Sequence, residues 1–300
     1  MALGSAPAPY VGRFAPSPTG PLHLGSLICA LASFLDARSN DGRWLLRMED
    51  LDPPREQPGA ADSILDSLRA HGLYWDGPVL WQSQRHAAYA AVVDQLLESG
   101  RAFRCDCSRQ MLAQSGGVYR GHCRNRNLSC NQPTAVRLRV DEDTLIQVDD
   151  GLQQALQQNL AQEVGDFTIQ RKDSLFAYQL AVVLDDAEQR CTHVLRGSDL
   201  YDSTPRQIYL QQVLGLEQPA YTHIPVITNA AGQKLSKQTH APALDNAEAC
   251  RHLCLALKFL NQATPPAHCN TPDSILSFAS ERWQLLAVPA TMGLPESSLA

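Results

Sequence analysis

The sequence predicts an α/β protein built on a doubly wound parallel sheet, and three observations carry this prediction. Apolar segments of strand length alternate with segments of helical period through residues 1–100, and the alternation returns after residue 166. A proline-rich loop follows the first strand segment, and the acidic stretch Glu49-Asp50-Leu51-Asp52 follows the second. Ligands of doubly wound sheets bind at the carboxyl ends of the strands, so both stretches are expected to border a site.

The first half of the sheet is assigned to residues 1–100. We predict strands at 10–15 and 44–48, and helices at 22–39, 60–70 and near 89–98. The strand at 44–48 is apolar except for one arginine, which is typical of a parallel strand buried on both faces. Gly72 and Gly100 end the two later helices, because glycine favours the position just after a helix.

Residues 101–166 are predicted to form an inserted subdomain, because glycine, cysteine, glutamine and asparagine become frequent there. The alternating pattern resumes in the second half of the sheet, assigned to 167–240. Within it we predict a strand at 192–195 and a helix at 205–214, which has Pro205 in its first turn.

The remaining residues, 241–300, are predicted to form a short helical region. Leu253, Leu257 and Leu260 recur there with helical spacing. The last ten residues, 291–300, are expected to fray, as chain ends commonly do.

Length and composition bound the class of protein. The 300 residues are 44% hydrophobic, as in ordinary globular chains, and we expect neither a secretory signal nor a membrane-spanning segment. Nine cysteines, an odd number without an export signal, favour free thiols and a metal site over disulfides, so a cytoplasmic location is expected. The net charge of −6 gives no footprint of nucleic-acid binding. Any RNA contact is therefore expected from a local group of arginines, Arg120, Arg124, Arg126, Arg137 and Arg139.

The first motif spans Arg13 to Ser26. Three prolines and a glycine between Ala15 and Pro21 exclude a helix, so a strand, a tight loop and a helix N-terminus follow one another. A helix N-terminus offers free N–H groups and a positive dipole end to phosphate. We place His23 in the first helical turn as a phosphate donor and Gly25 as a flat surface for a base; taken singly, each has a plain structural explanation.

Two short stretches resemble the signatures of class I aminoacyl-tRNA synthetases. His23-Leu24-Gly25-Ser26 resembles the first, and its flanking Pro-Ser-Pro-Thr-Gly matches the glutamyl and glutaminyl branch. Lys234-Leu-Ser-Lys237-Gln238 resembles the second, with Leu235 and Gln238 where methionine and serine are usual. The resemblance implies a Rossmann-type catalytic domain that binds ATP with Mg²⁺. It assigns ATP contacts to His23, Gly25, Ser26 and Lys237, and catalysis to His23, Lys234 and Lys237.

Lysines in the second stretch suit the chemistry of carboxylate activation. When a carboxylate attacks the α-phosphate of ATP, negative charge grows on the phosphoryl oxygens and on the departing pyrophosphate. Ammonium groups that reach this charge stabilise the transition state more than the ground state. Two lysines in such a loop are by themselves more often a solvated surface, so the assignment depends on the resemblance.

A glutamate substrate requires a carboxylate for its ammonium and an arginine fork for its γ-carboxylate. Resemblance to glutamyl-tRNA synthetases places Glu49 on the ammonium. It completes the glutamate site with Arg13, Phe14, Ala15, Pro16, Ser17, Tyr178 and Arg196. Core packing of Tyr178, and an ion pair between Arg196 and Asp199 or Asp202, are the structural alternatives. Val182 stands where glutamyl enzymes carry asparagine, which predicts an altered pocket.

A metal site is predicted in the insertion. Cys105 and Cys107 share one face of an extended segment, and Cys123 supplies a third thiolate toward the four ligands of a structural zinc. Chemistry alone favours His122 or Cys130 as the fourth ligand, whereas the family resemblance selects Tyr119. Buried reduced cysteines are the alternative. We expect one structural Zn²⁺ per chain.

The whole pattern is most similar to the truncated glutamyl-queuosine tRNA(Asp) synthetase family. The resemblance covers residues 10–240, and the segment 241–300 is shorter than the helical domain with which full glutamyl-tRNA synthetases read the anticodon. It implies that L-glutamate is activated with ATP and esterified to queuosine in the anticodon of tRNA(Asp), by an enzyme expected to be monomeric. A minimal synthetase that charges a tRNA 3′ end, and a non-catalytic glutamate- or adenylate-binding paralog, are the competing interpretations.

Overall fold

Five parallel strands form the centre of the computed structural model, which describes residues 9–114, 118–129, 132–229 and 242–299. Its first three strands are β1 (Val11–Phe14), β2 (Arg43–Met48) and β3 (Leu80–Trp81), and its last two are β9 (His193–Gly197) and β10 (Ala220–Ile224). The Thr192 N–H donates to the Val11 carbonyl oxygen at 2.9 Å, which sets β9 beside β1. The three-stranded sheet β3-β2-β1 and the two-stranded sheet β9-β10 thus lie side by side in this order, which confirms the predicted doubly wound parallel arrangement.

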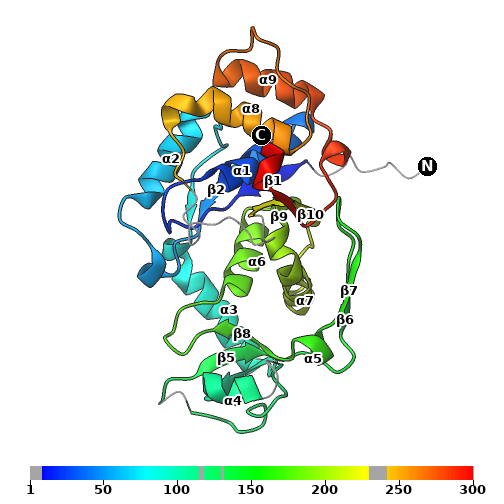
Figure 1. Cartoon of the computed structure of the whole chain (residues 1–300). Coiled ribbons are helices and arrows are strands. Elements are labelled where there is room, and N and C mark those ends of the chain that lie inside the picture. Colours follow the sequence, from blue (N-terminus) through cyan, green and yellow to red (C-terminus); the bar gives the residue numbers. More distant parts are fainter. Residues whose placement is uncertain (1–8, 115–117, 130–131, 230–241, 300) are drawn as a thin grey trace, which may run out of the picture.

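Helices cover both faces of this sheet (Figure 1). On one face lie α1 (Leu24–Ser39), α2 (Ala60–Ala70), α8 (Ala249–Phe259) and α9 (Pro272–Arg282); on the other lie α3 (His86–Glu98), α6 (Tyr178–Glu188) and α7 (Thr204–Leu214). Strand alternation divides the core accordingly, because Leu195 packs with the first group and its neighbour Val194 with the second. Two hydrophobic cores thus enclose the sheet.

The predicted elements of the sheet agree with the structure to within about three residues at each end. The helix predicted at 60–70 has those bounds, whereas the first helix begins two residues later than predicted, at Leu24. Its start is fixed by His23, which has an extended backbone and is the N-cap residue rather than part of the first turn. The expected position of His23 inside the helix is therefore wrong by one residue.

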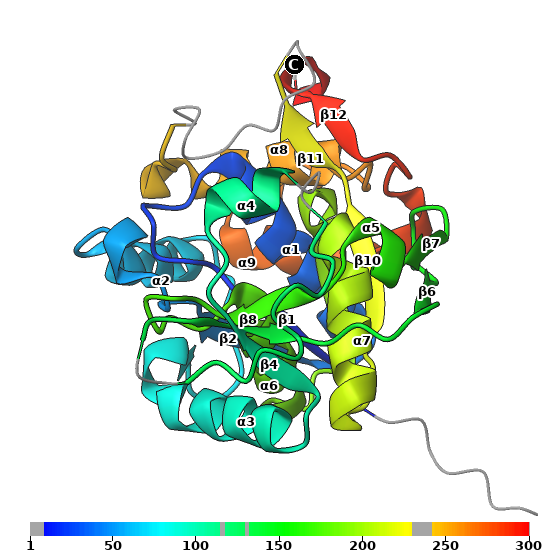
Figure 2. The ribbon, with the colours of Figure 1, turned by 90° about the horizontal axis from the view of Figure 1, so that it is seen from below.

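The inserted region forms a second, antiparallel sheet. Strands β4 (Ala102–Cys105), β5 (Ala135–Leu138) and β8 (Phe167–Gln170) pair in that order, with α4 (Arg109–Gln114) beside them. A hairpin of β6 (Leu145–Val148) and β7 (Leu156–Asn159) precedes the one-turn helix α5 (Leu160–Glu163). Figure 1 shows the antiparallel sheet and α4 below the parallel strands, and Figure 2 views the molecule from that side. Because β8 pairs with β5, the inserted unit runs through Gln170, beyond the predicted boundary at Asp166.

The end of the chain is paired, contrary to the expectation that 291–300 fray. Strand β12 (Gly293–Pro295) pairs in parallel with β11 (Val226–Thr228), which directly follows β10. The sequence pattern does not reveal this pairing, because the two strands are short and far apart in the chain. Among the described residues, the helices are too short or too polar to traverse a lipid bilayer.

Candidate active site

A cavity of about 400 Å³ opens at the carboxyl ends of β1 and β9, where the strand order of the parallel sheet reverses. This switch point is where doubly wound sheets bind ligands. The cavity lining includes every described residue that the sequence assigned to glutamate or ATP: Arg13, Phe14, Ala15, Pro16, Ser17, His23, Gly25, Ser26, Glu49, Tyr178 and Arg196. The structure therefore brings together residues from both halves of the sheet.

The proline-rich loop is held in place by backbone hydrogen bonds to the segment that follows β2. Glu49 N–H donates to the Pro16 carbonyl oxygen at 2.9 Å, and Gln57 N–H donates to the Pro18 carbonyl oxygen at 3.0 Å. Pro16 and Pro18 have no N–H of their own, so their backbone can bind neighbouring segments only through the carbonyl oxygens. The loop and Glu49 thus form one wall of the cavity.

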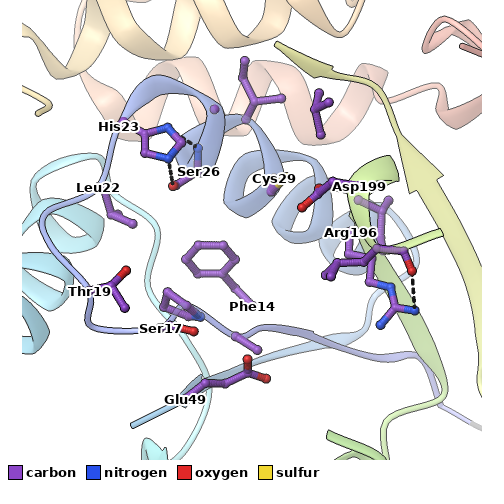
Figure 3. Close-up of a pocket in the computed structure, with 18 of the residues that line it drawn as sticks. Phe14, Ser17, Thr19, Leu22, His23, Ser26, Cys29, Glu49, Arg196 and Asp199 are labelled. Carbon is purple, nitrogen blue, oxygen red and sulfur yellow. Dashed lines mark hydrogen bonds between the residues drawn. The ribbon is translucent and has the colours of Figure 1, made fainter. Parts of the chain in front are cut away.

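One end of the cavity is built at the start of α1 (Figure 3). The Ser26 N–H donates to His23 Nδ1 at 3.3 Å, and the Ser26 hydroxyl lies 3.1 Å from Nε2. A Cβ added at Gly25 would come 3.1 Å from Cε1 of the His23 ring, so glycine leaves room for that ring. The positive end of the helix dipole and the free N–H groups of the first turn make this end suitable for phosphate.

Lys234 and Lys237 lie outside the described residues, but both flanks of their segment border this end of the cavity. On the amino-terminal side, Val226 and Ile227 line the cavity. On the carboxyl-terminal side, Ala243 bridges to His23, and the Leu244 N–H donates to the Leu22 carbonyl oxygen at 2.9 Å. The chain therefore leaves and re-enters the described structure beside the start of α1.

The opposite end of the cavity contains a buried cluster of charges. Arg13 donates through Nε to Asp186 Oδ1 at 3.1 Å, and Arg47 donates through Nη2 to the same oxygen at 2.7 Å. Burial alone would raise the pKa of Asp186, but the two guanidinium groups outweigh it and lower that pKa to about 2. Asp186 therefore stays ionised and fixes both arginines beneath the cavity.

Glu49 is the acidic group at this end. Its Oε1 lies 3.7 Å from Nε of Arg47, and that buried Nε has no hydrogen-bond partner among the described residues. Burial raises the pKa of Glu49 to about 7, which the positive charges of Arg47 and Arg13 only partly oppose. An ammonium group in the cavity would favour the carboxylate form, so the arrangement fits the predicted role of Glu49.

Arg196 enters the cavity from the end of β9, and hydrogen bonds hold its guanidinium at several atoms. Nη2 donates to Thr204 Oγ1 at 2.9 Å, and Nη1 lies 3.4 Å from the hydroxyl of Tyr178. Nε donates to His223 Nε2 at 2.9 Å. Tyr178 begins α6 and lines the cavity, and its pKa is raised by burial. Val182 is buried one turn later on α6 and does not line the cavity.

Several residues of this site were missed by the sequence analysis. Asp186 and Arg47 hold the charge cluster, and Thr19, Cys29 and Asp199 also line the cavity. The adjacent acids Asp185 and Asp186, which directly follow the apolar run 180–184, could have indicated the buried role of Asp186, because burying an unpaired carboxylate is energetically costly.

The predicted thiol cluster is present in the insertion. Among the described residues, Cys105, Cys107 and Cys123 place their sulfur atoms within 4.8 Å of one another, and all three are buried. The Tyr119 hydroxyl lies 3.6 Å from Cys105 Sγ, whereas His122 is exposed and outside the cluster. Cys130 lies outside the described residues. The geometry therefore favours Tyr119 over His122 as the fourth donor.

Cys107 and Cys105 differ in their tendency to ionise. Burial, with the thiols of Cys123 and Cys105, raises the pKa of Cys107 to about 12. Burial also acts on Cys105, but hydrogen bonds from Arg137, the Cys107 N–H and Tyr119 outweigh it and lower the pKa of that thiol. A divalent cation would stabilise several thiolates at once, and three thiolates with one oxygen donor make a four-coordinate set that suits zinc.

A substitution in this cluster tests the metal. Cys107→Ser is expected to lose most of the bound zinc and to loosen the antiparallel sheet, because a structural site needs all its ligands. Elemental analysis of metal-replete wild type and variant checks this, and Cys191→Ser, a buried cysteine outside the cluster, is the matched control. Wild-type protein without stoichiometric zinc would contradict the assignment.

The arginine group expected to contact RNA is largely occupied by protein partners. Arg124 pairs with Asp166 at 2.7 Å and Arg126 with Asp106 at 2.6 Å. Arg137 is buried, with its guanidinium 4.2 Å from the centre of the Tyr119 ring. Most of these arginines thus hold the insertion together, and their contact with RNA stays a prediction.

The titration of Glu49 predicts how substrate binding depends on pH. Its folded pKa of about 7 is raised, so below pH 7 the group is protonated and cannot pair with an ammonium. We expect the KM for an amino-acid substrate to rise about tenfold per pH unit below pH 7 and to level off above it. Glu49→Gln should remove this part of the pH dependence.

The ionisation of Glu49 that substrate binding needs should lower the stability of the fold, so Glu49→Gln should stabilise it. Since the folded pKa is above the unfolded value, ionisation of Glu49 destabilises the fold as pH rises from about 4.5 to about 7. Glu49→Gln should therefore raise the melting temperature at pH 8. A steady-state KM profile and thermal melts at pH 6, 7 and 8 check both effects, and a KM that is flat with pH in the wild type would contradict the role of Glu49.

Comparisons with known proteins match one family over most of the chain. A family model described as the catalytic domain of class I tRNA synthetases (E and Q) matches residues 10–249. A glutamyl-Q tRNA(Asp) synthetase of Pseudomonas entomophila is 52% identical, covering 97% of this chain and 98% of its own. A glutamyl-Q tRNA(Asp) synthetase of Thiobacillus denitrificans is 54% identical, covering 94% of this chain and 96% of its own.

Solved structures show the same fold. The glutamate-tRNA synthetase of Elizabethkingia anophelis matches with a TM-score of 0.80 at 24% identity, over 97% of this chain and 69% of that chain. A glutamate tRNA ligase of Elizabethkingia meningosepticum, solved in complex with its amino acid, matches with a TM-score of 0.78 at 25% identity, over 97% and 68% of the two chains.

Proposed function

This chain belongs to the glutamyl-Q tRNA(Asp) synthetase family of class I tRNA synthetases, and on that premise we propose that it activates L-glutamate with ATP and transfers the glutamyl group to queuosine in the anticodon of tRNA(Asp). The observation that carries the proposal is one cavity with a helix N-terminus at one end and a buried acid with two arginines at the other. These ends match the two substrates of an adenylate-forming reaction, a nucleotide triphosphate and a glutamate.

Glutamate fits the end of the cavity that contains Glu49, Arg13 and Arg196, because each charged group of the substrate meets a group of opposite charge there. The Glu49 carboxylate pairs with the substrate ammonium, and Arg196, with the hydroxyl of Tyr178, binds the γ-carboxylate. Arg13, held by Asp186, supplies positive charge beneath the substrate. The α-carboxylate then faces the start of α1, where the nucleotide lies.

Activation needs positioning and compensation of charge. An oxygen of the α-carboxylate attacks the α-phosphorus of ATP, the bond to the bridging oxygen breaks, and pyrophosphate leaves with that electron pair. His23, the Gly25 N–H, the Ser26 hydroxyl, and the lysines Lys234 and Lys237 bind the phosphates and stabilise the growing charge, with Mg²⁺ arriving on ATP. A hydroxyl of the queuosine ring then attacks the activated carbonyl, its proton is lost, and AMP departs.

The insertion is proposed to hold one structural Zn²⁺ through Cys105, Cys107, Cys123 and Tyr119. When bound, the ion would crosslink β4 to the loop at 118–123 and supply no chemistry to the reaction. We propose four units for the chain: residues 1–100 and 171–240 as the two halves of the catalytic domain, 101–170 as the insertion, and 241–300 as the carboxyl-terminal helical region.

The activation step is tested by exchange of labelled pyrophosphate into ATP without RNA. The proposal predicts exchange that depends on glutamate and is far weaker with glutamine or aspartate, because the fork of Arg196 selects a γ-carboxylate. Exchange that is absent with all three amino acids, in protein that is folded and metal-replete, would indicate a non-catalytic binding module instead.

A further inference from the structure

A line of buried side chains connects the inserted region to Arg196. Nδ1 of His223 lies 2.5 Å from Oδ2 of Asp150, and Nε2 of the same ring accepts from Nε of Arg196 at 2.9 Å. The side chains of Asp150 and His223 are fully buried, and Arg196 is 5% exposed. The three residues come from the loop after β6, from β10 and from β9.

These hydrogen bonds specify one state of the histidine ring. The Asp150 carboxylate can only accept, so the proton of His223 lies on Nδ1 and the Nε2 lone pair faces the guanidinium. Burial lowers the pKa of His223, and Arg196 lowers it further, against the opposing effect of Asp150. A second proton on Nε2 would point at the Nε–H of Arg196, so the ring acts as a neutral acceptor.

The acceptor atom, Nε2 of His223, determines the direction of the Arg196 guanidinium. With Nε bound to His223 and Nη2 bound to Thr204 Oγ1 at 2.9 Å, two corners of the planar group are fixed. The third corner, Nη1, is the one nearest Tyr178 and the cavity. A planar fork that cannot rotate binds a carboxylate with less loss of entropy on binding.

Backbone N–H groups hold the carboxylate of Asp150 in place. Its Oδ1 accepts from the N–H groups of Leu152 at 3.0 Å, Gln153 at 2.9 Å and His223 at 3.2 Å. The Gly151 N–H donates to the Tyr221 carbonyl oxygen at 2.9 Å, and a Cβ at Gly151 would lie 2.4 Å from Oγ1 of Thr222. The turn between β6 and β7 is therefore packed directly on β10.

We propose that Asp150 and His223 are positioning residues that orient Arg196 for the γ-carboxylate, so that the inserted region contributes to amino-acid selection. This inference rests on the proposed function, because it assumes that Arg196 binds glutamate. It gives the turn at 149–153 a task in the first step of the reaction, in addition to any contact that the insertion makes with RNA.

Two substitutions at His223 separate positioning from folding. The side-chain oxygen of glutamine reaches the place of Nε2, so His223→Gln keeps an acceptor for Arg196, whereas the shorter His223→Asn loses it. His223→Asn is expected to raise the KM for glutamate about tenfold, while kcat and the KM for ATP stay within about threefold of the wild-type values. The substitution should also lower the preference for glutamate over glutamine. His223→Gln should recover most of this loss.

The controls address stability and the ring itself. His71→Asn replaces an equally buried histidine at the C-cap of α2, which bonds to the Ser67 carbonyl and to His252, and should leave the KM for glutamate unchanged. Nitrogen-15 NMR of histidine-labelled wild type, with His223→Asn to assign the signal, should show a neutral Nδ1–H ring from pH 6 to 8.

The outcomes are distinguishable. A charged ring, an Nε2–H ring, or a His223→Asn enzyme with wild-type KM and wild-type selectivity overturns the positioning role while the proposed function stands. Wild-type protein that shows no glutamate-dependent exchange overturns the proposed function and the positioning role together. The NMR result is measured without substrate, so it reports on the ring in either case.

Discussion

Lys237→Ala is expected to slow adenylate formation by about 10²–10³-fold, with little change in the affinity for glutamate. The lysine belongs to Lys234-Leu-Ser-Lys237-Gln238, and the flanks of this segment border the nucleotide end of the cavity. An ammonium that contacts the phosphates mainly as charge develops on them lowers the barrier without strengthening binding of the amino acid. Single-turnover measurement gives the rate of adenylate formation. The stabilisation of the protein against thermal unfolding by added glutamate gives the affinity for glutamate.

A matched lysine controls for loss of charge alone. Lys172 donates to the Asp106 carbonyl oxygen in the insertion and does not line the cavity, so Lys172→Ala should leave the rate of activation within about twofold of wild type. If Lys237→Ala activates glutamate at the wild-type rate in a single turnover, the catalytic assignment of this lysine is wrong.

Arg196→Ala is expected to lower kcat/KM for glutamate by about 10³-fold. The substitution leaves the γ-carboxylate in a buried site without its cationic partner, and such losses are at the upper end of the range for hydrogen-bonded charge pairs. The kcat/KM of Arg196→Lys should fall between those of the wild type and of Arg196→Ala, because lysine keeps the positive charge and lacks the planar guanidinium fork. The measurement is pyrophosphate exchange over a range of glutamate concentrations.

The effect should be confined to the γ-carboxylate. Norvaline lacks that group, so its inhibition of the exchange reaction is expected to be similar in wild type and in Arg196→Ala. The KM for ATP should also be unchanged, since Arg196 lies at the amino-acid end of the cavity. A variant that loses norvaline and ATP binding to the same extent as glutamate would indicate that Arg196 supports the fold instead.

Most of the parallel sheet could be predicted from the sequence because its strands and helices are marked locally. Apolar runs, glycines after helices and the proline-rich loop each act over a few residues, and the predicted helix at 60–70 has the observed bounds. Pairing over long distances is not marked in this way. Strand β8 joins the inserted sheet and β12 joins β11, although nothing in either segment identifies its partner.

The same difference separates the predicted site residues from the missed ones. Arg13 and His23 belong to one continuous motif, and Glu49 and Arg196 lie at the ends of predicted strands. Asp186 comes from the last turn of α6, and its role depends on two arginines from β1 and β2. The ion pairs of the insertion could not be predicted either, because the acidic partners of Arg124 and Arg126 are distant in sequence.

The most direct test of the proposed function is to locate the glutamate after transfer. Purified enzyme, ATP and labelled glutamate are incubated with tRNA(Asp) that contains queuosine and, in parallel, with the same tRNA lacking it, and each product is digested to nucleosides. The proposal predicts label on the queuosine nucleoside of the first tRNA and no transfer to the second. Label on the terminal adenosine of either tRNA, or of unmodified tRNA(Glu), would contradict it and indicate a minimal synthetase that charges the 3′ end.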